Sequence, residues 1–232
     1  MTDKFKKYRP EVHSTLRNKI VTVPEAVYEA SGIMILGVRI KSLLFTTDVA
    51  LIRNHNADSV IAVYPFTPQL SIMDAIISSA SVPVFTGVGG GITSGTRAVV
   101  LGLQAELMGS YGVVVNAPMR NDVIKEIANA IDIPLIATVV SFEDDFMGKI
   151  HAGAKILNVS GGRNTVELVK KIRSKIGDEF PIIATGGNTD ESIRETIEAG
   201  ANAITYTPPT SAQLFSEVMD RYREGMGDYT KK

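Results

Sequence analysis

The sequence contains no cysteine, which excludes disulfides, thiolate metal ligands and a cysteine nucleophile. Its three histidines are scattered, with neither HxxxH nor HxH spacing, so we expect no metal site. No apolar run approaches the roughly 18 residues that a membrane span needs, and the polar N-terminus shows no secretory signal. We therefore expect a cytoplasmic protein that works without a metal or another cofactor.

An excess of charge of one sign is also missing. The chain has 24 basic and 25 acidic residues, which gives a formal net charge of −1. Without a basic field, nucleic acid is not expected as the main partner, and a small molecule is favoured instead. The length of 232 residues and the 44% of hydrophobic residues predict one globular domain over residues 1–232, with a homo-oligomer left open.

Short β-branched runs alternate with longer amphipathic stretches from about residue 33 onward. Each run is nearly continuous in apolar residues, as expected for parallel strands that are covered on both faces. The expected strands span residues 33–40, 59–64, 82–87, 112–116, 134–139, 155–159, 181–185 and 202–206. Eight such units predict a (β/α)8 barrel, the TIM barrel, although an open doubly wound sheet is an alternative.

The segments between these runs support the same fold. The motif Ala-Gly-Ala occurs at residues 152–154 and 199–201, where Gly153 and Gly200 are expected to end helices in the left-handed conformation. The segment before residue 33, which includes residues 24–30, is expected to form a leading helix that plugs the barrel floor.

The ligand of such a barrel binds in the loops at the C-terminal ends of the strands. These loops are rich in hydroxyls, amides and glycines, and they contain few carboxylates. A paired-carboxylate glycosidase site and a His–Asp metal centre are therefore not expected. The candidate ligand-binding residues are Arg39, Lys41, Thr86, Gly89, Gly90, Asn116, Ser160, Gly161, Gly162, Thr185, Gly186, Gly187 and Thr205.

Glycines after the third, sixth and seventh expected strands suggest an anionic ligand. Without a Cβ, backbone N–H groups at a helix start can approach a phosphate or carboxylate closely. Arg39 and Lys41 share strand parity with inward positions and would add positive charge at the mouth. The alternatives are that the glycines only form tight turns and that both cations are solvated. The run from Gly89 to Gly95 lacks the lysine of a P-loop.

The second half of the chain resembles the keto-deoxy-phosphogluconate aldolases. The resemblance implies a phosphate-binding barrel, but this sequence departs from the family's catalytic residues. Asn158 stands at the position of the Schiff-base lysine, whereas Lys155 lies near the barrel floor. Ala62 and Phe66 replace the catalytic glutamate and a substrate-binding arginine. The matching segments are VVVNA at 113–117, IPLIAT at 133–138, GAKILNVSGG at 153–162 and IIATGG at 182–187.

The chain is also similar to the glycerol-phosphate-responsive antiterminator proteins. The shared features are a polar residue at Asn158, the pair Gly186-Gly187, and an AGA-strand-Thr pattern over residues 199–207. This resemblance implies a ligand-sensing regulator rather than an enzyme. The segment 207–210, TPPT, departs from both families, because its two prolines lack N–H donors that would hold a phosphate.

We therefore expect an enzyme that acts on a small anionic metabolite, with lyase or isomerase chemistry. Asn158, Thr185 and Asn116 are expected to orient the substrate. Glu143 or Asp48 would supply acid–base function if its loop folds over the mouth. The alternatives are a non-catalytic metabolite sensor and a hydrolase.

Overall fold

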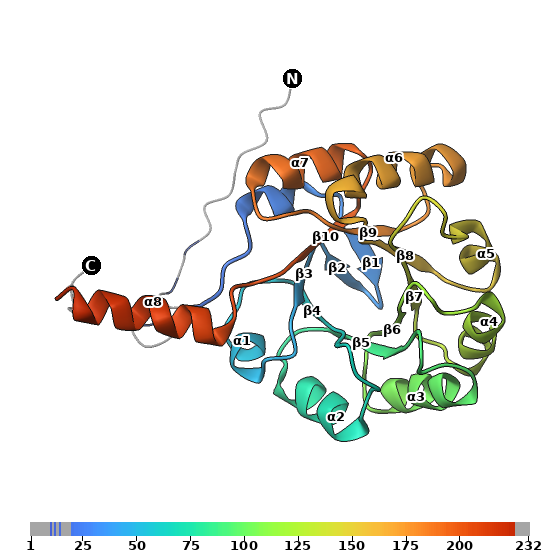
Figure 1. Ribbon diagram of the computed structural model, residues 1–232, viewed down its shortest axis with the longest axis horizontal. Helices are drawn as coiled ribbons and strands as arrows, with labels where there is room; N and C mark the ends of the chain where they lie inside the picture. Colours follow the sequence, from blue (N-terminus) through green and yellow to red (C-terminus); the bar gives the residue numbers. More distant parts are fainter. Residues whose placement is uncertain (1–9, 11, 13, 15–19, 226–232) are drawn as a thin grey trace.

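A computed structural model describes residues 10, 12, 14 and 20–225 of the chain. Eight parallel strands close into a barrel in the order β10-β3-β4-β5-β6-β7-β8-β9, and helices surround it (Figure 1). The closed barrel confirms the predicted (β/α)8 fold. Its strands are β3 (Ser42–Phe45), β4 (Ser59–Ala62), β5 (Val84–Gly89), β6 (Gly112–Val115), β7 (Leu135–Val139), β8 (Ile156–Val159), β9 (Ile182–Thr185) and β10 (Ala203–Tyr206).

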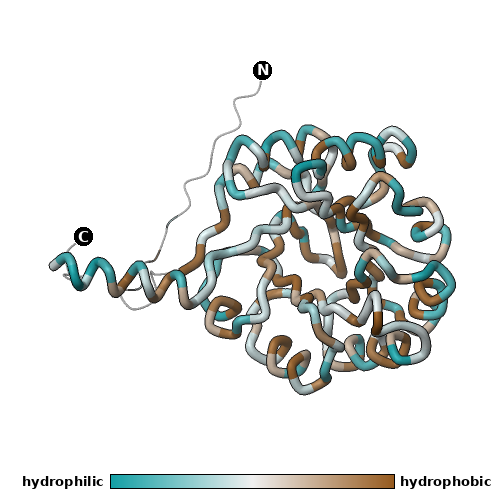
Figure 2. The backbone as a smooth tube through the Cα atoms, in the orientation of Figure 1, coloured by the Kyte–Doolittle hydropathy of each residue, from teal (hydrophilic) through white to brown (hydrophobic). Residues whose placement is uncertain are grey.

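Each barrel strand is followed by a helix. The helices are α1 (Val49–Arg53), α2 (Leu70–Ser79), α3 (Thr96–Leu107), α4 (Asn121–Ala130), α5 (Phe146–His151), α6 (Thr165–Ile176), α7 (Asp190–Glu198) and α8 (Ser211–Arg223). The first seven turn an apolar side toward the strands, and the apolar residues gather around the barrel in Figure 2. Helix α8 projects away from the barrel, and none of its thirteen described residues is buried. Within the described residues, no helix combines the length and apolar character of a membrane span.

The prediction that residues 33–40 form the first barrel strand is wrong. They form an antiparallel hairpin of β1 (Ile33–Ile35) and β2 (Val38–Ile40), which lies across the centre of the ring in Figure 1. Leu36 and Gly37 have φ values of 45° and 83°, the left-handed geometry of a tight hairpin turn. The buried isoleucines of this hairpin pack against inward residues of the barrel strands, including Phe85. The hairpin therefore closes the barrel floor, and β3 is the first barrel strand.

The leading helix is present but lies elsewhere than predicted. It is the short 3-10 helix η1 (Glu25–Glu29), which starts directly after Pro24. It buries Ala26 and Val27 and packs against α7 on the outside of the barrel. The predicted helix ends at Gly153 and Gly200 are confirmed, because their φ values are 114° and 112°.

We predict that folding stability depends on pH through His55. Its Nδ1 accepts a hydrogen bond from the Ala57 N–H at 3.0 Å, and burial lowers its pKa below the ordinary 6.5. The unfolded chain therefore binds the proton more readily, and the free energy of unfolding should fall as the pH drops through about 6.5. Urea denaturation at about pH 7.5 and about pH 5.5 would measure this loss.

Two variants test whether His55 causes the loss of stability at low pH. His55→Asn keeps an acceptor two residues before Ala57 but cannot titrate, so the part of the loss that His55 causes should disappear. The exposed His151→Asn should retain the parent's behaviour. An undiminished loss in His55→Asn would show that other groups cause it.

Candidate functional site

A cavity of about 230 Å³, here called the mouth cavity, opens at the C-terminal end of the barrel. Hydroxyl, amide and aliphatic side chains surround it. None of the described residues that line it carries a charge, so the cavity is neutral and combines polar with apolar walls. The lining residues are Phe45, Ile61, Val63, Val114, Asn116, Thr138, Val140, Asn158, Ser160, Thr185, Thr205 and Thr207.

Most polar residues of the mouth cavity lie on or directly after four neighbouring strands, β7, β8, β9 and β10, and Asn116 follows β6. The register of β7 and β8 places Thr138 beside Asn158, and the Asn158 Nδ2 donates to the Thr138 Oγ1 at 3.4 Å. The register of β9 and β10 places Thr185 beside Thr205. The Thr185 Oγ1 donates to the Ser160 Oγ at 3.3 Å. Parallel pairing therefore gathers one inward polar layer from residues far apart in sequence.

Two buried polar atoms in this layer lack a partner. The Asn158 Oδ1 and the Thr205 Oγ1 have no hydrogen bond to any described residue. Thr205 is only 6% exposed, so water has little access to its side chain. A buried group left unpaired costs about 1–3 kcal/mol. Such a cost is common at sites where a ligand completes the hydrogen bonds.

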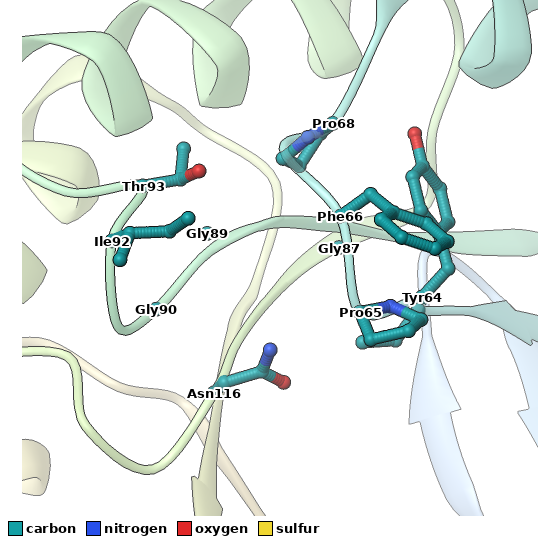
Figure 3. Close-up of a pocket in the computed structure, with 11 residues that line it drawn as sticks. Tyr64, Pro65, Phe66, Pro68, Gly87, Gly89, Gly90, Ile92, Thr93 and Asn116 are labelled. Carbon is teal, nitrogen blue, oxygen red and sulfur yellow. The ribbon is translucent and has the colours of Figure 1, made fainter.

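A second pocket, here called the rim pocket, adjoins the mouth cavity and has a volume of about 120 Å³. Figure 3 shows it between the loop after β4 and the glycine loop that follows β5. The two cavities share Val63 and Asn116. Its lining residues are Val63, Tyr64, Pro65, Phe66, Pro68, Gly87, Gly89, Gly90, Ile92, Thr93 and Asn116.

The glycine loop needs glycine for a close backbone approach. A Cβ at Gly90 would lie 2.5 Å from the Asn116 Cβ, and the φ of Gly90 is 135°. The Gly90 N–H donates to the Thr93 carbonyl at 2.8 Å, and the Asn116 N–H donates to the Gly89 carbonyl at 2.9 Å. Gly89 and Gly90 therefore form a tight turn and also line the rim pocket.

Most of the predicted polar residues reach the mouth. Asn116, Asn158, Ser160, Thr185 and Thr205 all line the mouth cavity. Their roles as ligand-binding or catalytic residues remain predictions.

Thr86, a predicted ligand-binding residue, points away from the mouth. The Thr86 hydroxyl lies 3.0 Å from the Ser110 Oγ and lines neither of the two cavities. Its neighbours Phe85 and Gly87 point inward, so strand alternation turns Thr86 toward the surrounding helices. Conversely, Thr138 was not predicted, although it is a lone polar residue in an apolar strand and a register neighbour of Asn158.

The prediction that Arg39 and Lys41 lie at the mouth is wrong. The Arg39 Nε donates to the Ser31 carbonyl at 2.8 Å, and the Lys41 Nζ donates to the Tyr28 carbonyl. Because residues 33–40 fold back as a hairpin, both cations precede the first barrel strand and lie at the floor. A buried cation does lie behind the mouth, since the Lys149 ammonium donates to the Ala117 carbonyl at 2.8 Å.

The predicted acid–base residues lie outside both cavities in the described part of the chain. Asp48 caps α1 by accepting from the Ala50 N–H at 2.8 Å. It also accepts from the Ser211 hydroxyl, which lowers the pKa of its carboxyl group. Glu143 is exposed in the loop between β7 and α5. No three acidic or histidine side chains among the described residues gather where they would hold a metal ion.

The glycines after β8 and β9 have structural roles. A Cβ at Gly186 would lie 2.8 Å from the Ile204 Cγ2, and a Cβ at Gly187 would lie 2.6 Å from the Ser192 Oγ. Gly187 and Gly162 also have φ values of 79° and 60°. The Gly161 N–H is already bonded to the Thr165 Oγ1 at 3.1 Å. These observations support the tight-turn alternative, and anion binding by these N–H groups remains a prediction.

No protein-family model and no curated protein matches the sequence. Solved structures do match. A phosphonopyruvate hydrolase aligns with a TM-score of 0.62 and 13% identity, over 84% of this chain and 85% of that one. A 2,3-dimethylmalate lyase of the PEP mutase/isocitrate lyase superfamily aligns with a TM-score of 0.61 and 14% identity, over 88% and 87%. A dihydrodipicolinate synthase from Bacillus anthracis aligns with a TM-score of 0.57 and 14% identity, over 81% and 77%.

The likeness is one of fold. At these identities it assigns no substrate and no residue role to this chain. The finer resemblances to keto-deoxy-phosphogluconate aldolases and to antiterminator proteins remain predictions, as do the homo-oligomer and the cytoplasmic location.

Proposed function

We propose that this protein is an enzyme that acts on a small metabolite with a carboxylate or phosphate group, by lyase or isomerase chemistry, in the mouth cavity. The observation that carries this proposal is the buried and unpaired pair of the Thr205 hydroxyl and the Asn158 carbonyl oxygen. Both lie at the end of the barrel where TIM-barrel ligands bind. Thr205, Thr207 and Ser160 supply hydroxyl donors that suit anionic oxygens.

The names of the similar structures add support for an enzyme. They are a hydrolase, a lyase and a synthase on the same architecture. In this chain Asn158 and Asn116 would orient the substrate through their amides. Glu143 or Asp48 would take part only after a movement that brings a carboxylate within hydrogen-bond reach of the ligand.

A second candidate function is a non-catalytic metabolite sensor. The observation that favours it is the neutral lining of the mouth cavity, in which no described residue can accept a proton near neutral pH. Acid–base catalysis needs such a group beside the substrate, whereas binding alone does not.

The proposal predicts opposite effects of Thr205→Val on stability and on binding. Valine has nearly the same shape and removes a buried hydroxyl without a partner, so the free energy of unfolding should rise by about 1 kcal/mol. Because the ligand loses a hydrogen bond, its dissociation constant should rise about 10- to 100-fold. Urea denaturation measures the first effect, and calorimetry with hits from a thermal-shift screen of carboxylic acids and sugar phosphates measures the second.

Thr196→Val is the matched control. Thr196 is also buried, but its hydroxyl donates to the Ser192 carbonyl at 2.7 Å, away from the mouth. This variant should lose about 1 kcal/mol and bind ligands like the parent. If Thr205→Val behaves like Thr196→Val in both measurements, the ligand does not bind in the mouth cavity. Product analysis of every hit separates the two functions, since a sensor is stabilised by its ligand without turnover.

A further inference from the structure

We propose that the ligand is a hydroxy acid with an apolar substituent, whose polar head occupies the mouth cavity and whose substituent occupies the rim pocket. This inference rests on the proposed function and specifies the substrate class of the same site.

The two cavities form one continuous site. Val63 and Asn116 line both of them, so a molecule that fills the mouth cavity can extend directly into the rim pocket. Their volumes, about 230 and 120 Å³, suit a small head with a modest side group. In Figure 3 the Asn116 side chain lies at the edge of the rim pocket, where the two parts of such a ligand would join.

The rim pocket is suited to an apolar group. Tyr64, Pro65, Phe66 and Pro68 come from one loop, and Ile92 comes from the glycine loop on the opposite side (Figure 3). Phe66 and Ile92 are 73% and 95% exposed. Large apolar side chains exposed beside a cavity are typical of ligand sites, because the ligand removes them from water.

Hydrogen bonds hold the walls of the rim pocket in place. The Thr93 Oγ1 donates to the Thr67 Oγ1 at 3.0 Å, which joins the glycine loop to the loop after β4. The Gln69 N–H donates to the Tyr64 hydroxyl at 3.0 Å. The pocket is therefore largely formed before binding, which reduces the entropy that binding must overcome.

The polar atoms of the mouth cavity define the head group. With its Nδ2 directed at Thr138, the Asn158 amide presents its Oδ1, which accepts hydrogen bonds and so suits a ligand donor such as a hydroxyl group. The Thr205 hydroxyl can donate, which suits a carboxylate oxygen. A hydroxy acid carries both a donor for the Asn158 Oδ1 and an acceptor for the Thr205 hydroxyl in one small head.

The test is isothermal calorimetry of the full chain with straight-chain 2-hydroxy acids, from glycolate to 2-hydroxyoctanoate. The dissociation constant should fall about fourfold for each added methylene until the rim pocket is full. The double variant Phe66→Ala/Ile92→Ala should lose most of this dependence on chain length. Phe215→Ala removes a similarly exposed ring from α8 and should keep all of it.

The outcomes separate this inference from the proposed function. If the acids bind and Thr205→Val weakens all of them, but chain length has no effect, the rim-pocket inference is overturned and the mouth site stands. The inference is also overturned if the double variant retains the parent's dependence on chain length. If no acid binds at any length, the hydroxy-acid inference is overturned. The sugar phosphates of the thermal-shift screen then show whether another ligand binds in the mouth cavity.

Discussion

Replacing Arg173 with methionine is expected to lower the free energy of unfolding by about 3–5 kcal/mol. Arg173 lies on α6, and its buried guanidinium joins the C-terminal ends of two helices to the floor of the barrel. It donates to the carbonyls of Gly200 at 2.8 Å, Gly177 at 2.9 Å and Phe180 at 2.7 Å, and to the Asn202 Oδ1 at 2.6 Å. Methionine fills the space of the side-chain stem but removes the guanidinium donor from the three carbonyls, whereas the Asn202 Oδ1 still accepts from the Ile182 N–H at 2.9 Å.

Urea denaturation measures the loss, and two further variants interpret it. Arg194 forms an exposed ion pair with Glu29, so Arg194→Met should cost less than about 1 kcal/mol. Arg173→Lys keeps the charge but reaches fewer acceptors and should fall between the two. Equal losses for Arg173→Met and Arg194→Met would contradict a stabilising role for the buried network.

The second large effect is expected at Phe85, where alanine should cost about 3–5 kcal/mol. Phe85 is fully buried inside the barrel, where it packs beneath the polar layer and against the floor hairpin. Its register neighbour Gly112 leaves room for the ring, since a Cβ there would lie 3.0 Å from the Phe85 Cδ1. The cavity left by alanine has rigid strands on all sides and can collapse only partly.

Phe142→Ala is the control for Phe85→Ala. The Phe142 ring is partly exposed and lies 5.3 Å from the Lys171 Nζ, so its removal should cost at most about 1 kcal/mol. A similarly small loss for Phe85→Ala would show that the floor adapts to the missing ring and that the ring is not closely packed.

The barrel was predictable because its strands are buried on both faces. The run at 112–116 is continuous in apolar residues and forms β6, and glycines at 153 and 200 end helices as the Ala-Gly-Ala motif predicts. The run at 33–40 has the same apolar character, yet it forms a hairpin. A short apolar run does not distinguish a strand of the barrel wall from a hairpin beneath it, because the hairpin also buries its isoleucines.

The site residues that lie at the C-terminal ends of barrel strands were predictable from the sequence. Asn158 and Thr185 line the mouth cavity because parallel strands bring their C-terminal ends together. Arg39 was predicted at the mouth because residues 33–40 were predicted to form a barrel strand. Thr86 was predicted to face the mouth, but side chains alternate along the strand and it faces outward. Gly89, Gly90 and Asn116 of the rim pocket were among the predicted ligand-binding residues. The pocket itself was not predicted, because it forms between two loops whose contact depends on the completed barrel.

The hairpin at the barrel floor determines how a ligand enters and leaves the mouth cavity. With the floor filled by β1 and β2, the described residues direct a molecule in the mouth cavity to arrive and leave at the C-terminal end of the barrel. Product and substrate would then use one passage in turn, so a product that leaves slowly would compete with the next substrate. In a sensor, the same passage would set how long the signal lasts after the ligand disappears from solution.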